Sequence, residues 1–227
     1  YIDPSAEIAE SAVIRGDVVV KEGARIFDNA VINGPAYIGK DVIVANNSLV
    51  RGSMINEGSV VGYTTEIARS FLGRGVWTHT NYIGDSIISD NCSFGSGAVT
   101  GNLRLDEGNI AVNIKGEKVS SGQNKFGLIT GEGLRAGINS SFMPGVKIGS
   151  NCIIGAGIII GKDIPGKGTS FIPGFSLGGF LNYKLNDRFS LQPEVLITTK
   201  GSLINTVGDI NLHNVFIYYE MPILVKI

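Results

Sequence analysis

One repeat limits the possible folds of this chain more than any other feature: an aliphatic residue at every sixth position of its N-terminal part. The repeat comprises Ile2, Ile8, Ile14, Val20, Ile26, Ile32, Ile38, Val44 and Val50. A smaller apolar residue follows four positions after most of these, with Ser48 as the polar exception. Three such hexads make one triangular coil of about 18 residues, and stacked coils bury the aliphatic column. The sequence therefore predicts an all-β fold, a parallel β-helix of hexapeptide repeats over residues 2–165.

The repeat changes phase along the chain. Past Ala68 the six-residue spacing no longer fits, and it resumes two positions out of phase. The new phase comprises Tyr82, Ile88, Phe94, Thr100, Phe142, Ile148, Ile154 and Ile160. We therefore expect one break in the coil between Ala68 and Tyr82, with Tyr82 in the inward column.

Residues 102–128 lack the hexad pattern. They contain an alternating stretch, 109–115, followed by a turn at Gly116-Glu117. Alternation next to a glycine turn is typical of a β-hairpin, so we expect residues 102–128 to project from a β-helix domain that spans residues 1–167. Projecting loops on solenoids often carry binding sites.

Composition narrows the function classes. With 19 basic and 20 acidic residues the formal charge is -1, so no broad field favours nucleic acid. The 32 glycines, without a collagen period, indicate recurring tight turns. Cys92 and Cys152 both fall on the inward small-residue position, which predicts buried thiols rather than a disulfide scaffold or a metal site.

The late repeats resemble the left-handed β-helix of hexapeptide-repeat transferases. They read Ile148-Gly149-Ser150-Asn151-Cys152-Ile153, Ile154-Gly155-Ala156-Gly157-Ile158-Ile159 and Ile160-Gly161-Lys162-Asp163. Parallel crossovers are normally right-handed, so the left-handed winding is expected from the resemblance alone. The same resemblance implies a homotrimer with active sites between subunits.

One of the two histidines, His79, lies where the hexad spacing fails. An imidazole suits the removal of a proton from an amine near neutral pH, and a break in a rigid coil can place it beside a groove. The pattern alone leaves two interpretations open: a catalytic base, or a surface histidine in a loop.

The stretch from Thr78 to Ser86 is similar to the His-x-x-Tyr-x-Gly-Asp motif of a known family. That family comprises the bifunctional sugar-1-phosphate nucleotidylyltransferase/acetyltransferases, especially the archaeal type. Further segments resemble it in the same order: Thr100 to Glu107, Lys115 to Gly122, Ala136 to Asn139 and Pro144 to Gly149. The resemblance implies acetyl-coenzyme A dependent N-acetyltransfer to an amino-sugar 1-phosphate of the glucosamine-1-phosphate class, in nucleotide-sugar biosynthesis.

The resemblance also assigns residue roles. His79 is expected to be the general base, Tyr82 and Asn102 contacts to the amino sugar, and Arg51 a partner of its phosphate. In the late coils, Gly137 and Ala156 are expected to contact acetyl-coenzyme A. No metal is required for this acyl transfer. For Arg51 and Asn102 the residue pattern alone leaves a solvated turn arginine and a corner asparagine as alternatives.

Two departures from the family pattern favour a second hypothesis, a non-catalytic trimerisation or regulatory module. The family usually reads Glu-Ile-Lys-Asn-Ser where this chain has Glu66-Ile67-Ala68-Arg69-Ser70, so the lysine is lost unless Arg69 replaces it. A family Arg-Arg-Lys run appears here as Gln123-Asn124-Lys125, with less positive charge. Nothing in the sequence resembles the glycine-rich nucleotide loop of the family, so we expect no uridylyl transfer from this chain.

After Pro165 a period of two replaces the hexads. Residues 171–185, 189–198 and 217–225 read as amphipathic strands, with a tight turn at Asn186-Asp187 and a looser link over residues 201–212. These residues, 168–227, resemble part of a small outer-membrane β-barrel, and a small antiparallel cap on the β-helix is the alternative. We interpret the combination as a chimera or gene fusion. The β-helix is expected to be cytoplasmic; membrane contact of the tail, including an outer-membrane location, is left open.

Overall fold

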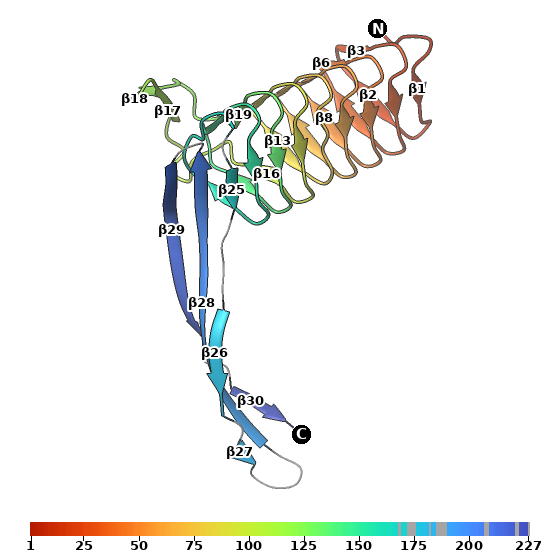
Figure 1. The fold of residues 1–227 in the computed structure, drawn as a ribbon. Helices are drawn as coiled ribbons and strands as arrows, with labels where there is room; N and C mark the ends of the chain where they lie inside the picture. The colour runs from red at the N-terminus through yellow and green to blue at the C-terminus, as the bar shows by residue number, and fades with distance from the viewer. Residues whose placement is uncertain are drawn as a thin grey trace.

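The computed structural model describes residues 1–167, 169–171, 176–181, 183–184, 190–206, 209–220 and 223–226. Short parallel strands stack as the coils of a left-handed β-helix, and antiparallel strands follow it (Figure 1). The predicted fold class is confirmed. None of the described residues forms a helix that could cross a membrane.

The chain visits three faces in turn, each built of parallel strands, and most coils add one strand to each face; Ile2, Trp77 and Ile164 contribute single bridges instead. Face I contains β1 (Glu7–Ile8), β4 (Arg25–Ile26), β7 (Ile43–Val44), β10 (Val60–Val61), β15 (Ser93–Phe94), β20 (Arg135–Ala136) and β23 (Ile153–Ile154). Face II contains β2 (Val13–Arg15), β5 (Val31–Asn33), β8 (Leu49–Arg51), β11 (Glu66–Ala68), β13 (Tyr82–Gly84), β16 (Val99–Thr100), β21 (Ser141–Phe142) and β24 (Ile159–Ile160). Face III contains β3 (Val18–Val20), β6 (Ala36–Ile38), β9 (Met54–Ile55), β12 (Phe71–Leu72), β14 (Ile87–Ile88), β19 (Ile129–Thr130) and β22 (Lys147–Ile148).

The inward column forms one continuous core. Its aliphatic side chains are completely buried from Val20 onward, apart from a few per cent of exposure near the C-terminal end. Cys92 and Cys152 belong to this core as buried thiols that form no disulfide. The core therefore follows the hexad prediction in its two regular parts.

The phase change differs from the prediction, because it is not one break. Four separate steps of five residues shorten the coils; two of them precede His79 and a third contains it. They run from Val50 to Ile55, Ile67 to Leu72, Thr78 to Ile83 and Ile83 to Ile88, all of whose inward side chains are buried. The inward residue is Ile83, whereas Tyr82 points outward and is half-buried, which corrects the prediction. Thr78 and Trp77 obscure the hexad pattern in the sequence. The polar Thr78 points inward and is buried, whereas the apolar Trp77 points outward and is 56% exposed.

The shortened coils carry polar residues at the inward corners. These are Ser48, Ser53, Ser59, Thr65, Ser70, Asn81 and Ser86, each at most 5% exposed. The Ser53 hydroxyl accepts from the Ser70 N–H over 3.1 Å, and the Ser70 hydroxyl accepts from the Ser86 N–H over 3.0 Å. These hydroxyls satisfy backbone groups in the tight turns, which alanine could not do.

The segment between β16 and β19 leaves the coil as an arm. It contains the antiparallel pair β17 (Ala111–Ile114) and β18 (Glu117–Ser120), which projects sideways in Figure 1. The two-residue turn is Lys115-Gly116, both with positive φ, and not the expected Gly116-Glu117. Glycine at the second turn position fits the primed turn that closes such a hairpin.

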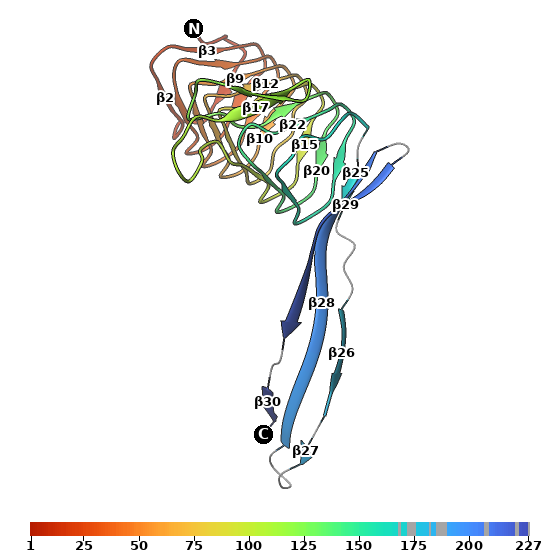
Figure 2. The same ribbon diagram turned by 90° about the vertical axis from the view of Figure 1, so that its left-hand side faces the viewer.

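The parallel stacking continues beyond Pro165. Strand β25 (Thr169–Phe171) pairs in parallel with β23, so face I extends past the expected end of the repeat. The long strand β28 (Ser190–Thr206) then pairs in antiparallel fashion with β25 and with all of the remaining described strands of the tail (Figure 2). The tail strands are β26 (Ser176–Phe180), β27 (Tyr183–Lys184), β28 (Ser190–Thr206), β29 (Asp209–Glu220) and β30 (Ile223–Lys226).

The expected loose link over residues 201–212 is wrong. Residues 203–206 pair with residues 209–212, and only a bulge between Gly201 and Ser202 interrupts the ladder. The polar residues there suggested a link, but ladder hydrogen bonds satisfy the backbone whichever side chains it carries. The predicted turn at Asn186-Asp187 lies outside the described residues.

Candidate functional site

His79 lies at the edge between faces I and II, two residues after Trp77. Its N–H donates to Asn81 Oδ1 over 2.6 Å, and the Thr65 hydroxyl donates to its carbonyl. Asn81 is buried and also donates to the Gly95 carbonyl over 2.8 Å. The backbone of His79 is thus fixed by the core, whereas its imidazole is exposed and makes no hydrogen bond within the described part of the chain.

Tyr82 and Asn102 meet on the outer side of face II. Asn102 Nδ2 donates to the Tyr82 hydroxyl over 3.1 Å and also to the Asp85 carboxylate. Gly84 leaves room for this pair, because a Cβ there would lie 2.5 Å from the Tyr82 hydroxyl and 2.8 Å from Asn102 Nδ2. The structure therefore joins two of the predicted substrate contacts into one hydrogen-bonded unit.

Arg51 lies on β8, which β11 separates from the strand of Tyr82. Its Nε and Nη2 donate to Glu66 Oε1 over 2.8 and 2.6 Å, and Glu66 is in register with Tyr82 across β11 and β13. Glu66 therefore fixes the guanidinium beside the Tyr82 strand. A guanidinium has five N–H donors, so those not used by Glu66 stay available to an anion.

Gly137 and Ala156 lie on the same edge as His79, further along the helix. Trp77, Ser93, Arg135 and Ile153 are in register, so His79, Gly95, Gly137 and Gly155, two residues after each, line this edge. A Cβ on Gly137 would lie 2.7 Å from the Ala156 nitrogen, so glycine is required there for packing alone. At about 4.8 Å per coil, the edge covers roughly 14 Å from His79 to Ala156.

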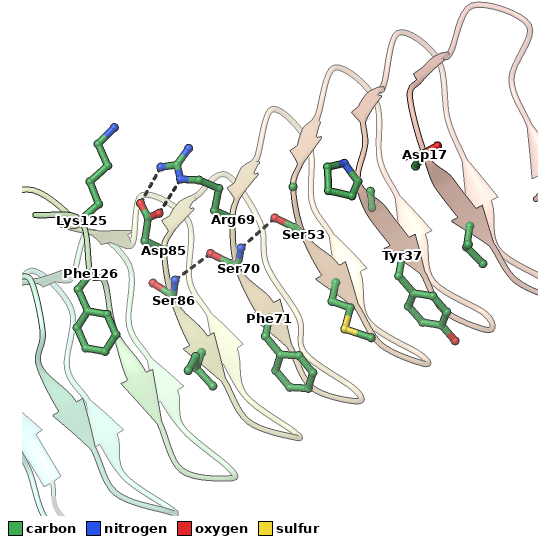
Figure 3. Close-up of a pocket in the computed structure, with 16 residues that line it drawn as sticks. Asp17, Tyr37, Ser53, Arg69, Ser70, Phe71, Asp85, Ser86, Lys125 and Phe126 are labelled. Carbon is green, nitrogen blue, oxygen red and sulfur yellow. Dashed lines mark hydrogen bonds and ion pairs between the residues drawn. The ribbon is translucent and has the colours of Figure 1, made fainter. Parts of the chain in front are cut away.

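A groove of about 710 Å³ runs along face III, on the far side of Tyr82 and Asn102 from His79. Its floor is an apolar row, Tyr37, Met54, Phe71 and Ile87, and its wall carries Arg69, Asp85 and Lys125 (Figure 3). Arg69 Nε and Nη2 donate to the two Asp85 carboxylate oxygens over 2.6 and 2.7 Å. His79 is not part of this groove.

Asp85 is the shared acceptor of the cluster. Burial alone would raise its pKa, but hydrogen bonds from Arg69 and Asn102, and the charges of Arg69 and Lys125, lower the pKa below its usual value. Asp85 is therefore a carboxylate at neutral pH. No role for Asp85 was predicted from the sequence, although the Tyr82-x-Gly84-Asp85 spacing contained the information.

Comparison with known proteins identifies relatives of the β-helix. The chain is 48% identical over 164 residues to the bifunctional protein GlmU of Methanocaldococcus jannaschii, covering 71% of this chain and 40% of that protein. It is 39% identical over 166 residues to a bifunctional sugar-1-phosphate nucleotidylyltransferase/acetyltransferase of Sulfurisphaera tokodaii, covering 72% and 41%. The chain thus spans about two fifths of the length of these relatives.

A crystal structure of a UDP-N-acetylglucosamine acyltransferase shares the fold. Its TM-score is 0.52 at 15% identity, over 74% of this chain and 67% of that one. No family model matches the sequence.

These findings define the class first: the described coils form a left-handed hexapeptide-repeat β-helix of the kind found in acyltransferases. The sequence identities then make this part of the chain a homologue of the bifunctional sugar-1-phosphate nucleotidylyltransferase/acetyltransferases, which confirms the resemblance given for residues 2–165. The resemblance given for residues 168–227 is not supported by these comparisons.

Proposed function

We propose that this chain transfers an acetyl group from acetyl-coenzyme A to the amine of an amino-sugar 1-phosphate of the glucosamine-1-phosphate class. The observation that carries the proposal is the exposed His79 imidazole on a core-fixed backbone, in a β-helix homologous to named acetyltransferases. A neutral imidazole in this position can take a proton from a substrate ammonium.

The reaction needs one proton acceptor and two oriented substrates. His79 removes a proton from the sugar ammonium, and the amine lone pair attacks the thioester carbonyl. A C–N bond forms, the C–S bond breaks, and the second proton lost by the nitrogen passes to the departing thiolate, which gives an amide and free coenzyme A, while His79 keeps the first proton. The Tyr82–Asn102 unit would orient the sugar, and the free N–H groups of Arg51 would bind its phosphate.

Acetyl-coenzyme A would lie along the edge that carries His79, Gly137 and Ala156. Small residues keep this edge open: Ala156 is exposed and Gly137 is half-exposed. The roughly 14 Å between His79 and Ala156 suits an extended thiol-bearing arm that delivers its acetyl group to the histidine.

The active assembly would be a homotrimer, in the cytoplasm where acetyl-coenzyme A is supplied. The row on face III supports assembly, because Met54, Phe71 and Ile87 are 44%, 41% and 49% exposed side by side. Exposed apolar rows of this kind are normally covered by a partner surface. Light scattering measures the assembly directly.

The test is thiol release from acetyl-coenzyme A with glucosamine 1-phosphate as acceptor. Wild-type protein is expected to turn over, and His79→Ala to lose about 10²- to 10⁴-fold in kcat. Glucosamine without phosphate is the matched acceptor control, and His213→Ala, at the other histidine, is the matched variant. Full turnover by His79→Ala would contradict the mechanism, and absence of wild-type turnover would contradict the function.

The ion pairs of the site support a second candidate, a non-catalytic trimerisation or regulatory module. Ala68, at the position of the expected lysine, is completely buried, while Arg51 and Arg69 are both paired with carboxylates. A stable trimer that binds no acetyl-coenzyme A in calorimetry would favour this candidate over the enzyme.

A further inference from the structure

The Asp85 carboxylate connects two elements that are distant in sequence. Arg69, at the end of β11, donates to both of its oxygens, and Asn102, at the root of the arm, donates to one of them. Backbone hydrogen bonds also anchor the end of the arm to Asn102 and Asp85. Phe126 N–H donates to the Asn102 backbone carbonyl over 2.9 Å, and Gly127 N–H donates to the Asp85 backbone carbonyl over 2.7 Å. The Asp85 side chain in this pair is 13% exposed.

The backbone at Arg69 and Asp85 is costly for these residue types. Both have left-handed φ angles, 48° and 49°, at the edge between faces II and III. In earlier coils that edge carries Gly16 and Gly52, with φ of 76° and 57°, a conformation that suits glycine. Two consecutive coils thus replace a favourable glycine by a charged residue, and the two charges pair with each other.

We propose that Asp85 is a positioning residue of the active site, whose carboxylate fixes Asn102 and the Tyr82 hydroxyl toward the amino sugar and aligns Arg69 beside them. This inference rests on the proposed acetyltransfer. Asn102 Nδ2 donates to both Asp85 and Tyr82, so the orientation of the side-chain amide is set and its Oδ1 can accept a hydrogen bond from the sugar. Without the carboxylate, the amide can rotate and the Tyr82 hydroxyl loses its fixed donor.

The corner geometry supplies a sharp test, because Asp85→Gly removes the carboxylate and places the preferred residue in the left-handed corner. We expect Asp85→Gly to fold, because the preference of this left-handed corner for glycine offsets part of the stability lost with the ion pair. The KM for glucosamine 1-phosphate should rise about 10- to 100-fold, which is the usual effect of a lost charge-assisted hydrogen bond, while the KM for acetyl-coenzyme A stays within about twofold. Asp85→Asn should produce the same split.

The matched control is Asp90→Asn. Asp90 also pairs with an arginine sixteen residues before it, Arg74, over 2.7 Å, but at the edge between faces III and I. Asp90→Asn is expected to leave both KM values unchanged.

A double-mutant cycle shows whether Asp85 acts through Asn102. In an Asn102→Ala background, Asp85→Gly is expected to add less than about threefold to the acceptor KM. Asp85→Gly kinetics equal to wild type, additive effects in the cycle, or equal rises in both KM values would each overturn the positioning role while wild-type turnover persists. Absence of wild-type turnover overturns the proposed function, and this inference with it.

Discussion

Asn102 donates a hydrogen bond to the Tyr82 hydroxyl over 3.1 Å although the two residues lie 20 positions apart in the chain. The stacking of face II explains the contact. Tyr82 is in register with Val99 on the next strand, and Asn102 lies two residues after the end of that strand. One coil of the helix thus brings a phenol and an amide into contact on the outer surface. Because each group restrains the other, a change at one is expected to affect the other.

The first prediction concerns the glycine beneath this contact. Gly84→Ala would place a Cβ 2.5 Å from the Tyr82 hydroxyl and 2.8 Å from Asn102 Nδ2, so the pair must separate. We expect kcat/KM for the amino-sugar phosphate to fall about tenfold or more, since misplaced contacts can cost 10²-fold. Steady-state kinetics measure this effect.

The control for that prediction is Gly108→Ala in the arm. A Cβ on Gly108 would make only ordinary contacts, the nearest at 3.4 Å from Asp106 Oδ1. Its activity is expected to match wild type. If Gly84→Ala also matched wild type, the Tyr82–Asn102 unit would have no part in acceptor binding.

The second prediction concerns the buried hydroxyls of the shortened coils. Ser70→Ala removes the donor to the Ala68 carbonyl, at 2.8 Å, and the acceptor of the Ser86 N–H, at 3.0 Å. Both backbone groups would lose a buried partner, so we expect a loss of about 1–3 kcal/mol in the free energy of unfolding. Denaturant titration measures it, with exposed Ser96→Ala as control. A loss equal to that of the control would show that the hydroxyls do not stabilise the short coils.

The regular coils were predictable because apolar residue type and inward position coincide there. The two-residue phase change was visible in sequence, but its origin in four five-residue steps was not, because Thr78 is inward and Tyr82 outward. The contact between Tyr82 and Asn102 and the central place of Asp85 depend on the stacking of neighbouring coils. The residues that it brings together are 16, 17 or 20 positions apart, so no fixed repeat in the sequence marks them as neighbours.

The third prediction is a pH dependence of stability. The pKa of Asp85 in the folded protein is below its ordinary value of 3.8. The ion pair therefore stabilises the fold fully above pH 3.8, and this stabilisation disappears as the pH falls through the lowered pKa. The thermal midpoint of Asp85→Asn should lie below that of wild type by a constant amount between pH 5 and 8. That difference should shrink below pH 3.8. A difference that stayed constant as the pH fell from 3.8 into the acid-unfolding range would contradict the assignment.

The last prediction concerns the anchoring of the arm. Ile110 is 2% exposed, and its Cγ2 lies so close to Gly145 that a Cβ there would be 2.7 Å from it. Lys147 Nζ adds a hydrogen bond to the Asn113 carbonyl over 2.6 Å. Ile110→Ala should weaken the attachment by about 2–5 kcal/mol, so hydrogen exchange in β17 and β18 should accelerate while the coils keep their protection.

Ile114→Ala, at the end of β17, is the control, because its side chain is 46% exposed. If the arm carries Asn102 into the site, Ile110→Ala should also raise the acceptor KM, whereas Ile114→Ala should not. The arm would thereby act as a support for Asn102 through its root, where Phe126 N–H meets the Asn102 carbonyl. If Ile110→Ala accelerated exchange in the arm but left the acceptor KM unchanged, the attachment of the hairpin would have no effect on the site. The root of the arm would then hold Asn102 without help from the hairpin.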